Sequence, residues 1–559
     1  MPVSPGDGFV GSFRAGAAAA ATDEQPSIRL SGRIRNLAAL RADLGAPPDL
    51  PVQALLQRAW RRWSDGLFAR LDGEFALALA DGDRLLLCRD PSGLCHLYWH
   101  QAADGRVRYA TDLAVLLRQP GVPRRIARHS LHEYLRFLDI SAPNTVYEGI
   151  QSVEPGGLQG WTGTQRTARP LRPDAAADPA MPERFDDCVD ALQAHLQCSV
   201  EQRLAGASRP AAFLSGGIDS ALLCALAARQ RGDLTAITVG FDGDAFDESR
   251  VAAGIASHLG LAHEVLRFDH DQYLQAFDTL ARRMDQPMAD PATPATLLAF
   301  EFCQRRFDSV LDGGGADEAV GALPPRHIRL ATGPVSRLPA PLRQGLAQLL
   351  RASPRWAGYA PIVDYEHPAD TMIRWRGFTR PEVEALCGEP VSFAHTQFYR
   401  TYERHSRRDP LERYRALMTA MPSERLNQAL RVVAAPVQFP FWDGATDRYL
   451  RQLPRGYRFR PGEPKRILRA LLARHLPAAL WDLPKHSFDF PLQAFLSAQD
   501  HALVHRHLAP ARWQAHGLLD ADRVWDYARR FIAGDRQLMF RIWSLVVLGA
   551  WLEAQPGQP

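Results

Sequence analysis

A short stretch in the middle of the chain limits the fold more than any other feature, because its residue types specify a strand, a tight turn and the start of a helix. An apolar run ends at Leu214, Gly216 and Gly217 follow, and residues 221–228 form a second apolar run rich in alanine and leucine. Glycine lets the backbone approach a bound group closely. The amides of a first helical turn have no partner within the helix and lie at the positive end of its dipole. A glycine-rich loop that leads from a strand into a helix is therefore predicted to bind phosphate.

The side chains of this loop suit a nucleotide. Ser215 and Ser220 supply hydroxyls, and Asp219 supplies a carboxylate of the kind that binds Mg²⁺. The loop lacks the Gly-Lys-Ser/Thr ending of a Walker motif. An ordinary glycine-rich turn would be the better interpretation of an isolated Ser-Gly-Gly, but the complete Ser-Gly-Gly-Ile-Asp-Ser pattern between a strand and a helix favours function. The pattern resembles the pyrophosphate loop of the ATP pyrophosphatases, enzymes that split ATP into AMP and pyrophosphate.

Strand-like and helix-like segments alternate after this loop. In chain order they are 234–241 (strand), 248–260 (helix), 263–268 (strand), 297–307 (helix) and 308–311 (strand). Such alternation predicts a parallel sheet with right-handed crossovers. Ligands of these sheets bind beyond the carboxyl ends of the strands. The loop 212–220 and a second glycine-rich loop, 312–318, are both predicted to lie there.

The second loop resembles one in the asparagine synthetases, although Asp312 stands where that family usually has serine and Gly314 where it often has an acid. The resemblance implies that Asp219 and Asp317 share Mg²⁺ on the phosphates of ATP. A surface turn is the alternative for such a loop taken alone. The residues that the resemblance assigns to nucleotide binding are Leu214, Ser215, Gly216, Gly217, Asp219, Ser220, Val239, Asp312 and Gly313.

Lysine is rare in this chain: of 66 basic residues only Lys465 and Lys485 are lysines. Arginine is a planar fork, whereas lysine is a compact charge with a tunable pKa, so a retained lysine indicates a place where guanidinium does not substitute. Both lysines fall where the asparagine synthetases have functional lysines. The resemblance implies that Lys465 contacts phosphate and that Lys485 stabilises the transition states in which the adenylate forms and is consumed. A solvated helix residue is the alternative for either one alone.

Residues 1–165 are rich in predicted strands and resemble the glutaminase domain of the asparagine synthetases. An active family glutaminase has a cysteine directly after the initiator Met, whose thiolate attacks glutamine. Here that position is Pro2, and the first cysteine is Cys88, inside a predicted strand. We therefore expect a degenerate amidotransferase-like domain that serves as an inert scaffold.

The complete prediction is an α/β protein with three segments. An N-terminal glutaminase-like (Ntn-type) αββα sandwich spans 1–165, a proline-punctuated linker spans 166–184, and an asparagine synthetase-like ATP-pyrophosphatase domain spans 185–559. The C-terminal domain is expected to be a doubly wound parallel sheet with added helices. A length of 559 residues is too great for one core.

Composition excludes some classes of function. The net charge of +4 is small for this length and no polybasic run occurs, so nothing indicates nucleic acid. No apolar run of about 20 residues and no signal peptide was recognised. The seven cysteines form no Cys-x-x-Cys pair, which agrees with a reducing cytoplasm and with the absence of a zinc site.

The resemblance leaves several reactions open. The shared chemistry is adenylation of a carboxylate followed by attack of a nitrogen, and without a glutaminase the nitrogen is expected to be an amine of the substrate. Pro436 replaces an acid that asparagine and β-lactam synthetases carry four positions before the proline of a Pro-Phe-Leu-Asp element, here Pro440. This absent acid, the unusual loop 312–318 and the length resemble the lasso-peptide cyclase branch of the family. The resemblance implies an ATP-dependent enzyme that joins an Asp or Glu side chain of a precursor peptide to its N-terminal amine, releasing AMP and pyrophosphate.

The implied partners of such a cyclase are the precursor peptide and a leader-peptide protease of the same pathway. A β-lactam synthetase-like or asparagine synthetase-like ligase with a small amino acid substrate is one alternative, and a non-catalytic nucleotide-binding regulator is another. His486 is a candidate base, with a surface histidine as the simpler interpretation.

Overall fold

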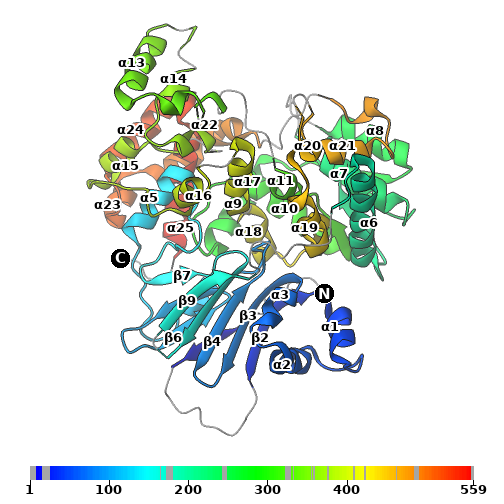
Figure 1. Cartoon of the computed structure of the whole chain (residues 1–559). Helices are drawn as coiled ribbons and strands as arrows, with labels where there is room; N and C mark the ends of the chain where they lie inside the picture. Colours follow the sequence, from blue (N-terminus) through cyan, green and yellow to red (C-terminus); the bar gives the residue numbers. More distant parts are fainter. Residues whose placement is uncertain are drawn as a thin grey trace.

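The computed structural model describes residues 8–14, 26–163, 165–171, 181–241, 248–321, 329–331, 333–353, 355–356, 359–373, 377–406, 409–420, 424–460, 463–483 and 490–555. Figure 1 shows a strand-rich N-terminal domain in blue and cyan beneath a larger, mainly helical C-terminal domain. The two parts meet along an interface, and residues 128–137 of the N-terminal part lie among the helices of the C-terminal domain.

Two antiparallel sheets make the N-terminal domain. One has the strand order β1-β6-β5-β7 and the other β2-β3-β4-β8-β9. Its strands are β1 (Val10–Phe13), β2 (Ser27–Ile34), β3 (Gly73–Asp81), β4 (Arg84–Arg89), β5 (Tyr98–Gln101), β6 (Val107–Ala110), β7 (Ile150–Ser152), β8 (Gly157–Thr162) and β9 (Gln165–Pro170). Its helices are α1 (Leu37–Leu44), α2 (Val52–Trp63), α3 (Gly66–Arg70), α4 (Leu113–Leu117) and α5 (Arg128–Phe137).

Alternation along the strands builds two cores in this domain. In β4, Leu85 and Leu87 face the other sheet and pack with Trp99 and Trp161, while Leu86 faces the opposite way. The outer core joins the β2–β9 sheet to α1 and α2, whose buried residues include Leu40, Leu44, Leu55, Leu56 and Trp60. A side-chain period of two explains how one strand serves both cores. The predicted sandwich of two sheets with flanking helices is confirmed.

Strand β9 lies in a range that the sequence predicted to be mostly linker. It pairs with β8 along its whole length, from Thr162 opposite Gln165 to Gly157 opposite Pro170. Every residue of β9 is exposed, so it is an edge strand without the alternating apolar pattern that signals a half-buried one. The linker thus begins later than residue 166, and the domain boundaries otherwise stay a prediction.

The C-terminal domain is built on a five-stranded parallel sheet of order β12-β11-β10-β13-β14. Its strands are β10 (Pro210–Phe213), β11 (Thr235–Val239), β12 (Ala262–Leu266), β13 (Ser309–Leu311) and β14 (Val437–Gln438). Helices α6 (Phe185–Leu204), α7 (Ile218–Ala228) and α8 (Ser249–Leu259) share one core with Ala212 and Leu311, whereas Ala211 and Val310 point into the other core. Cores on both faces confirm the predicted doubly wound sheet.

The second face of the sheet is covered by α9 (His270–Arg283), α10 (Thr293–Arg306) and α18 (Glu424–Val432), of which only α10 was predicted. The other helices of this domain are α11 (Ala316–Val320), α13 (Ala340–Arg351), α14 (Ala360–Val363), α15 (Arg380–Cys387), α16 (Gln397–Arg404), α17 (Pro410–Ala420), α19 (Gly444–Gln452), α20 (Arg455–Arg458), α21 (Arg466–Leu472), α22 (Leu492–Leu508), α23 (Pro510–His516), α24 (Ala521–Ile532) and α25 (Met539–Ala554). Short 3₁₀ turns lie at Val335–Arg337, Pro368–Met372, Pro440–Trp442, Ala478–Leu480 and Arg536–Leu538.

The C-terminal helix corrects the prediction that the chain has no apolar stretch of membrane-spanning length. Residues 536–554 are long and apolar enough to cross a membrane by length and composition. Within the described residues, however, 67% of that window is buried in the protein, and α25 packs against α22, α9 and α24. A helix that is apolar all round and covered on several sides is a core helix.

Candidate active site

The two predicted loops meet at one edge of the parallel sheet. Strands β10 and β13 are direct neighbours in register, with Ala212 opposite Leu311. Parallel neighbours end on the same side, so the loop before α7 and the loop before α11 lie beside each other. Gly313 makes this approach possible, because a Cβ at that position would lie only 3.3 Å from Asp219 Cβ and from the Ser220 nitrogen.

A cavity of about 260 Å³ opens between the loops. Its walls come from the carboxyl ends of β10 and β11, the two loops, and one end each of α10 and α18. The lining residues are Phe213, Leu214, Ser215, Gly217, Asp219, Ser220, Ile237, Thr238, Val239, Phe241, Glu248, Ala295, Thr296, Ala299, Phe300, Asp312, Gly313, Arg425 and Leu426. The predicted nucleotide residues are all among them except Gly216, which lies in the loop itself.

Hydrogen bonds within the chain hold the first loop in its turn. The amide of Ser215 donates to Ser220 Oγ at 3.0 Å, and the amide of Gly217 donates to Ser215 Oγ at 3.1 Å. The amide of Gly216 donates to Glu248 Oε2 at 3.3 Å. Three successive amides of the loop thus donate to oxygen acceptors of the chain itself, one of them a carboxylate.

Lys465 lies between the two predicted metal ligands. Its Nζ is 2.5 Å from Asp219 Oδ2 and 2.7 Å from Asp317 Oδ1. The lysine side chain is only 9% exposed. Burial by itself lowers the pKa of Lys465, but the Asp219 and Asp317 carboxylates outweigh it and raise that pKa above its usual value. The ammonium is thus charged at neutral pH and neutralises one of the two negative charges.

The backbone of Lys465 is also unusual. It occupies the left-handed region with φ 55° and ψ 39°, directly before the first residue of α21. Residues other than glycine adopt this conformation rarely and at a cost in free energy. A conformation that costs free energy indicates a functional role, and Lys465 in this conformation reaches both carboxylates.

The carboxylates fit a shared Mg²⁺ ion. Asp219 and Asp317 both reach a single ammonium nitrogen, so their oxygens already converge on one cation. Carboxylate oxygens are hard ligands that Mg²⁺ prefers, and it typically takes only one or two of them beside phosphate oxygens and water. When bound, the ion would neutralise charge on the phosphates of ATP.

Two further acids near the cluster have raised pKa values. Burial, assisted by the adjacent Asp317 charge, raises the pKa of Glu318 to about 7. Burial also raises the pKa of Asp312, although its Oδ1 accepts a 2.7 Å hydrogen bond from the Gly314 amide. Neither effect was predicted, since both depend on how closely the helices cover the second loop.

Residues of α10 and α18 were missed by the sequence analysis although they line the cavity. Thr296 and Phe300 come from α10, and Arg425 comes from the first turn of α18, more than one hundred residues further along the chain. None lies in a motif, and no local signal identifies a helix end that approaches a sheet from a distance. Phe241 ends the predicted strand and Glu248 begins the predicted helix, but neither was predicted to belong to the site.

Three sequence predictions fall elsewhere. Lys485 and His486 lie outside the described residues, so their roles stay predictions. Pro436 stands directly before β14, where its carbonyl accepts a hydrogen bond from the Val310 amide, and it lines a cavity between the two domains instead of the nucleotide cavity.

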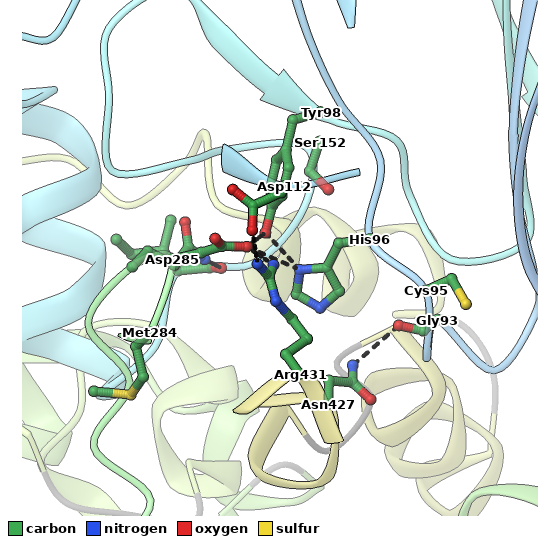
Figure 2. Close-up of polar contacts among 12 residues, drawn as sticks. Gly93, Cys95, His96, Tyr98, Asp112, Ser152, Met284, Asp285, Asn427 and Arg431 are labelled. Atoms are coloured by element: carbon green, nitrogen blue, oxygen red, sulfur yellow. Dashed lines mark hydrogen bonds and ion pairs between the residues drawn. The ribbon is translucent and has the colours of Figure 1, made fainter. Parts of the chain in front are cut away.

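The N-terminal domain is attached to α18. Asn427 Nδ2 donates to the carbonyl of Gly93 at 3.0 Å, and Arg431 Nη2 lies 2.9 Å from Asp112 Oδ2 (Figure 2). Arg425, at the other end of the same helix, lines the nucleotide cavity. One helix thus joins the N-terminal domain to the candidate site.

A glycine-rich loop, two converging carboxylates and a lysine at the carboxyl edge of a doubly wound sheet are the arrangement expected of a nucleotide-dependent enzyme. Comparison with known families agrees. The asparagine synthase family model matches residues 191–553, and the glutamine amidotransferase domain model matches residues 17–170. The chain belongs to the asparagine synthase family, whose members are ATP-dependent amide-forming ligases.

Individual relatives are distant. A Mycobacterium bovis protein assigned as a glutamine-hydrolyzing asparagine synthetase is 26% identical over 93% of this chain and 83% of its own length. Asparagine synthetase (glutamine-hydrolyzing) 1 of Bacillus subtilis is 23% identical over 95% of this chain and 85% of its own. The carboxyethyl-arginine β-lactam synthase of Streptomyces clavuligerus is 30% identical over 53% of this chain and 55% of its own.

Proposed function

We propose that this ligase is a peptide cyclase of the lasso-peptide type. It adenylates an Asp or Glu side chain of a precursor peptide and joins that carbonyl to the peptide's N-terminal amine. The observation that carries the adenylation step is the convergence of Asp219, Asp317 and Lys465 beside the nucleotide cavity.

In the first step, a carboxylate oxygen of the peptide attacks the α-phosphorus of ATP. The bond from that phosphorus to the oxygen bridging to the β-phosphorus breaks, which yields an acyl-adenylate and pyrophosphate. We assign the first loop and the Lys465 ammonium to the phosphates, and Asp219 and Asp317 to Mg²⁺.

In the second step, the N-terminal amine attacks the activated carbonyl carbon. The carbon–oxygen bond to AMP breaks, AMP departs, and the nitrogen loses a proton to give the amide. We assign to Lys485 the stabilisation of charge in both steps.

The N-terminal domain supports an amine that belongs to the substrate. Position 2 is proline, and Cys95, which lines the cavity between the domains, is buried. Burial, with the nearby Asp90 and Glu74 carboxylates, raises the pKa of Cys95 well above its usual value. A protonated thiol is a poor nucleophile, so this cysteine does not replace the missing one.

A small-substrate ligase is the second candidate. The 30% identity to a β-lactam synthase over about half of each chain favours it. Such an enzyme would also use an internal amine and would also need no glutaminase. The intact carboxylate–lysine cluster disfavours the alternative of a non-catalytic nucleotide-binding regulator.

Substrate-dependent pyrophosphate exchange separates these candidates. Radioactive pyrophosphate enters ATP only when the enzyme forms an acyl-adenylate reversibly. We expect exchange with a short linear peptide that carries an Asp or Glu side chain and a free N-terminal amine. Exchange with β-amino acid derivatives or aspartate, and none with the peptide, would favour the second candidate.

A further inference from the structure

A large groove with an unusual charge lies at the junction of the two domains. Its volume is about 910 Å³, and it shares no lining residue with the nucleotide cavity. Its walls come from the end of α4, the segment before α5, the end of α9 and the end of α25. It is lined by six arginines, which are Arg118, Arg124, Arg125, Arg128, Arg282 and Arg283.

Each acid of the groove already has an arginine partner. Arg431, which stands behind the groove, forms ion pairs with both Asp112 and Asp285, as Figure 2 shows. Asp285 also accepts a 2.8 Å hydrogen bond from the Tyr98 hydroxyl. The remaining acid, Glu148, pairs with Arg125 at 2.7 Å.

Among the described residues, two of the six arginines have carboxylate partners. Besides Arg125, Arg128 lies 2.9 Å from Glu389, and its other nitrogens donate to the carbonyls of Cys387 and Leu518. Within the part of the chain that the structure describes, the other four arginines make no ion pair, and all four are exposed. Counted with Arg431, seven arginines stand against the four carboxylates of Asp112, Asp285, Glu148 and Glu389, so the groove has a surplus of three cations, whereas the formal net charge of the entire chain is only +4.

Helix dipoles account for only part of this surplus. Arg282 and Arg283 lie in the last turn of α9 and Arg118 caps α4, where cations are favoured. Arg124 lies in a loop, however, and the three elements bring their charges to the same cavity. The groove lining also includes apolar side chains, of which Leu117 and Leu518 are half-buried and Ile126 and Met284 are buried.

We propose that this groove binds an extended acidic peptide segment in which Asp or Glu side chains alternate with apolar ones. Guanidinium groups form paired hydrogen bonds with carboxylates. In an extended segment, successive side chains point to opposite faces, so carboxylates meet the arginine rim while apolar side chains meet the apolar lining. The apolar lining favours a peptide over a nucleic acid backbone, and the site does not depend on the reaction at the nucleotide cavity.

The test measures fluorescence anisotropy of a labelled eight-residue peptide of alternating Glu and Leu with the full-length protein. We expect saturable binding that weakens as salt is raised, and no binding of the peptide with Gln in place of Glu. Arg282→Gln/Arg283→Gln should weaken binding about tenfold or more. The matched control is Arg61→Gln/Arg62→Gln, an exposed arginine pair in the last turn of α2 outside the groove, which should leave binding unchanged.

Four outcomes would overturn the proposal. The first two are an equal loss of peptide affinity in both double variants, and binding of the Gln peptide as tight as that of the Glu peptide. The other two are tighter binding of single-stranded DNA, or of vesicles containing phosphatidylserine, than of the Glu peptide, if Arg282→Gln/Arg283→Gln abolishes that binding. Circular dichroism of both variants establishes that they are folded.

Discussion

Removing the Lys465 ammonium should destabilise the protein and stop adenylation. In Lys465→Met, two carboxylates that now share a cation at 2.5 and 2.7 Å would face each other. A hydrogen bond to a charged group contributes ~1.5–3 kcal/mol. Asp317 is 35% exposed, so solvent screens its share, and we expect a loss of about 2 kcal/mol in the free energy of unfolding.

Urea unfolding followed by tryptophan fluorescence measures this change. Millimolar Mg²⁺ should restore part of the lost stability of Lys465→Met, because a divalent cation can replace the ammonium between the carboxylates. Arg474→Met is the control, since it removes a cation from an exposed pair with Asp190 and should cost under about 0.5 kcal/mol.

The same variant should lose about 100-fold or more of its pyrophosphate exchange rate, as expected when a group that stabilises developing charge is removed. Unchanged stability together with unchanged exchange in Lys465→Met would refute the role of this lysine. Stability that fell equally in Arg474→Met would show that the loss reflects general charge and not the cluster.

Three further predictions follow from single positions. Burial raises the pKa of Glu318 from 4.5 to about 7 in the folded protein, so the unfolded chain binds fewer protons between these pH values. The free energy of unfolding should therefore fall by up to about 3 kcal/mol as pH rises from 4.5 to 7. Urea unfolding of Glu318→Gln should lack this slope, and an unchanged slope would contradict the assignment. Gly313→Ala places a methyl group 3.3 Å from Asp219 Cβ, so ATP binding measured by calorimetry should weaken about tenfold (~1.4 kcal/mol). The control Gly232→Ala, whose methyl group meets nothing within 4 Å, should bind ATP normally. Equal affinities of the two variants would show that the second loop does not belong to the site. Lys485→Arg should bind ATP almost normally yet lose about 100-fold in turnover, because the wider guanidinium misplaces the reacting groups, and near-parental turnover would reduce Lys485 to a replaceable charge.

Local sequence patterns predicted the parts of the site that each lie within one strand–loop–helix unit. The conformation of each glycine-rich loop depends on residues that are adjacent in the sequence. The register of β10 with β13 brings the two loops together as expected. Lys465 was expected to contact phosphate, and the structure adds its bridge between Asp219 and Asp317.

Features that depend on distant segments could not be predicted from the sequence. Arg425 and Thr296 reach the cavity from helices whose position is set by tertiary packing. Strand β9 has no buried face and hence no periodic signal. The raised pKa of Glu318 results from how closely neighbouring helices cover it, which a composition or a motif does not encode.

The most direct test of the central claim is mass spectrometry of the peptide product. The purified protein is incubated with ATP, Mg²⁺ and the linear precursor peptide, without glutamine or ammonia. We predict a product that has lost one water, contains a link between the N-terminus and an Asp or Glu side chain, and appears with one AMP and one pyrophosphate each. An unchanged peptide, with asparagine formed from aspartate when glutamine or ammonia is supplied, would contradict the proposal.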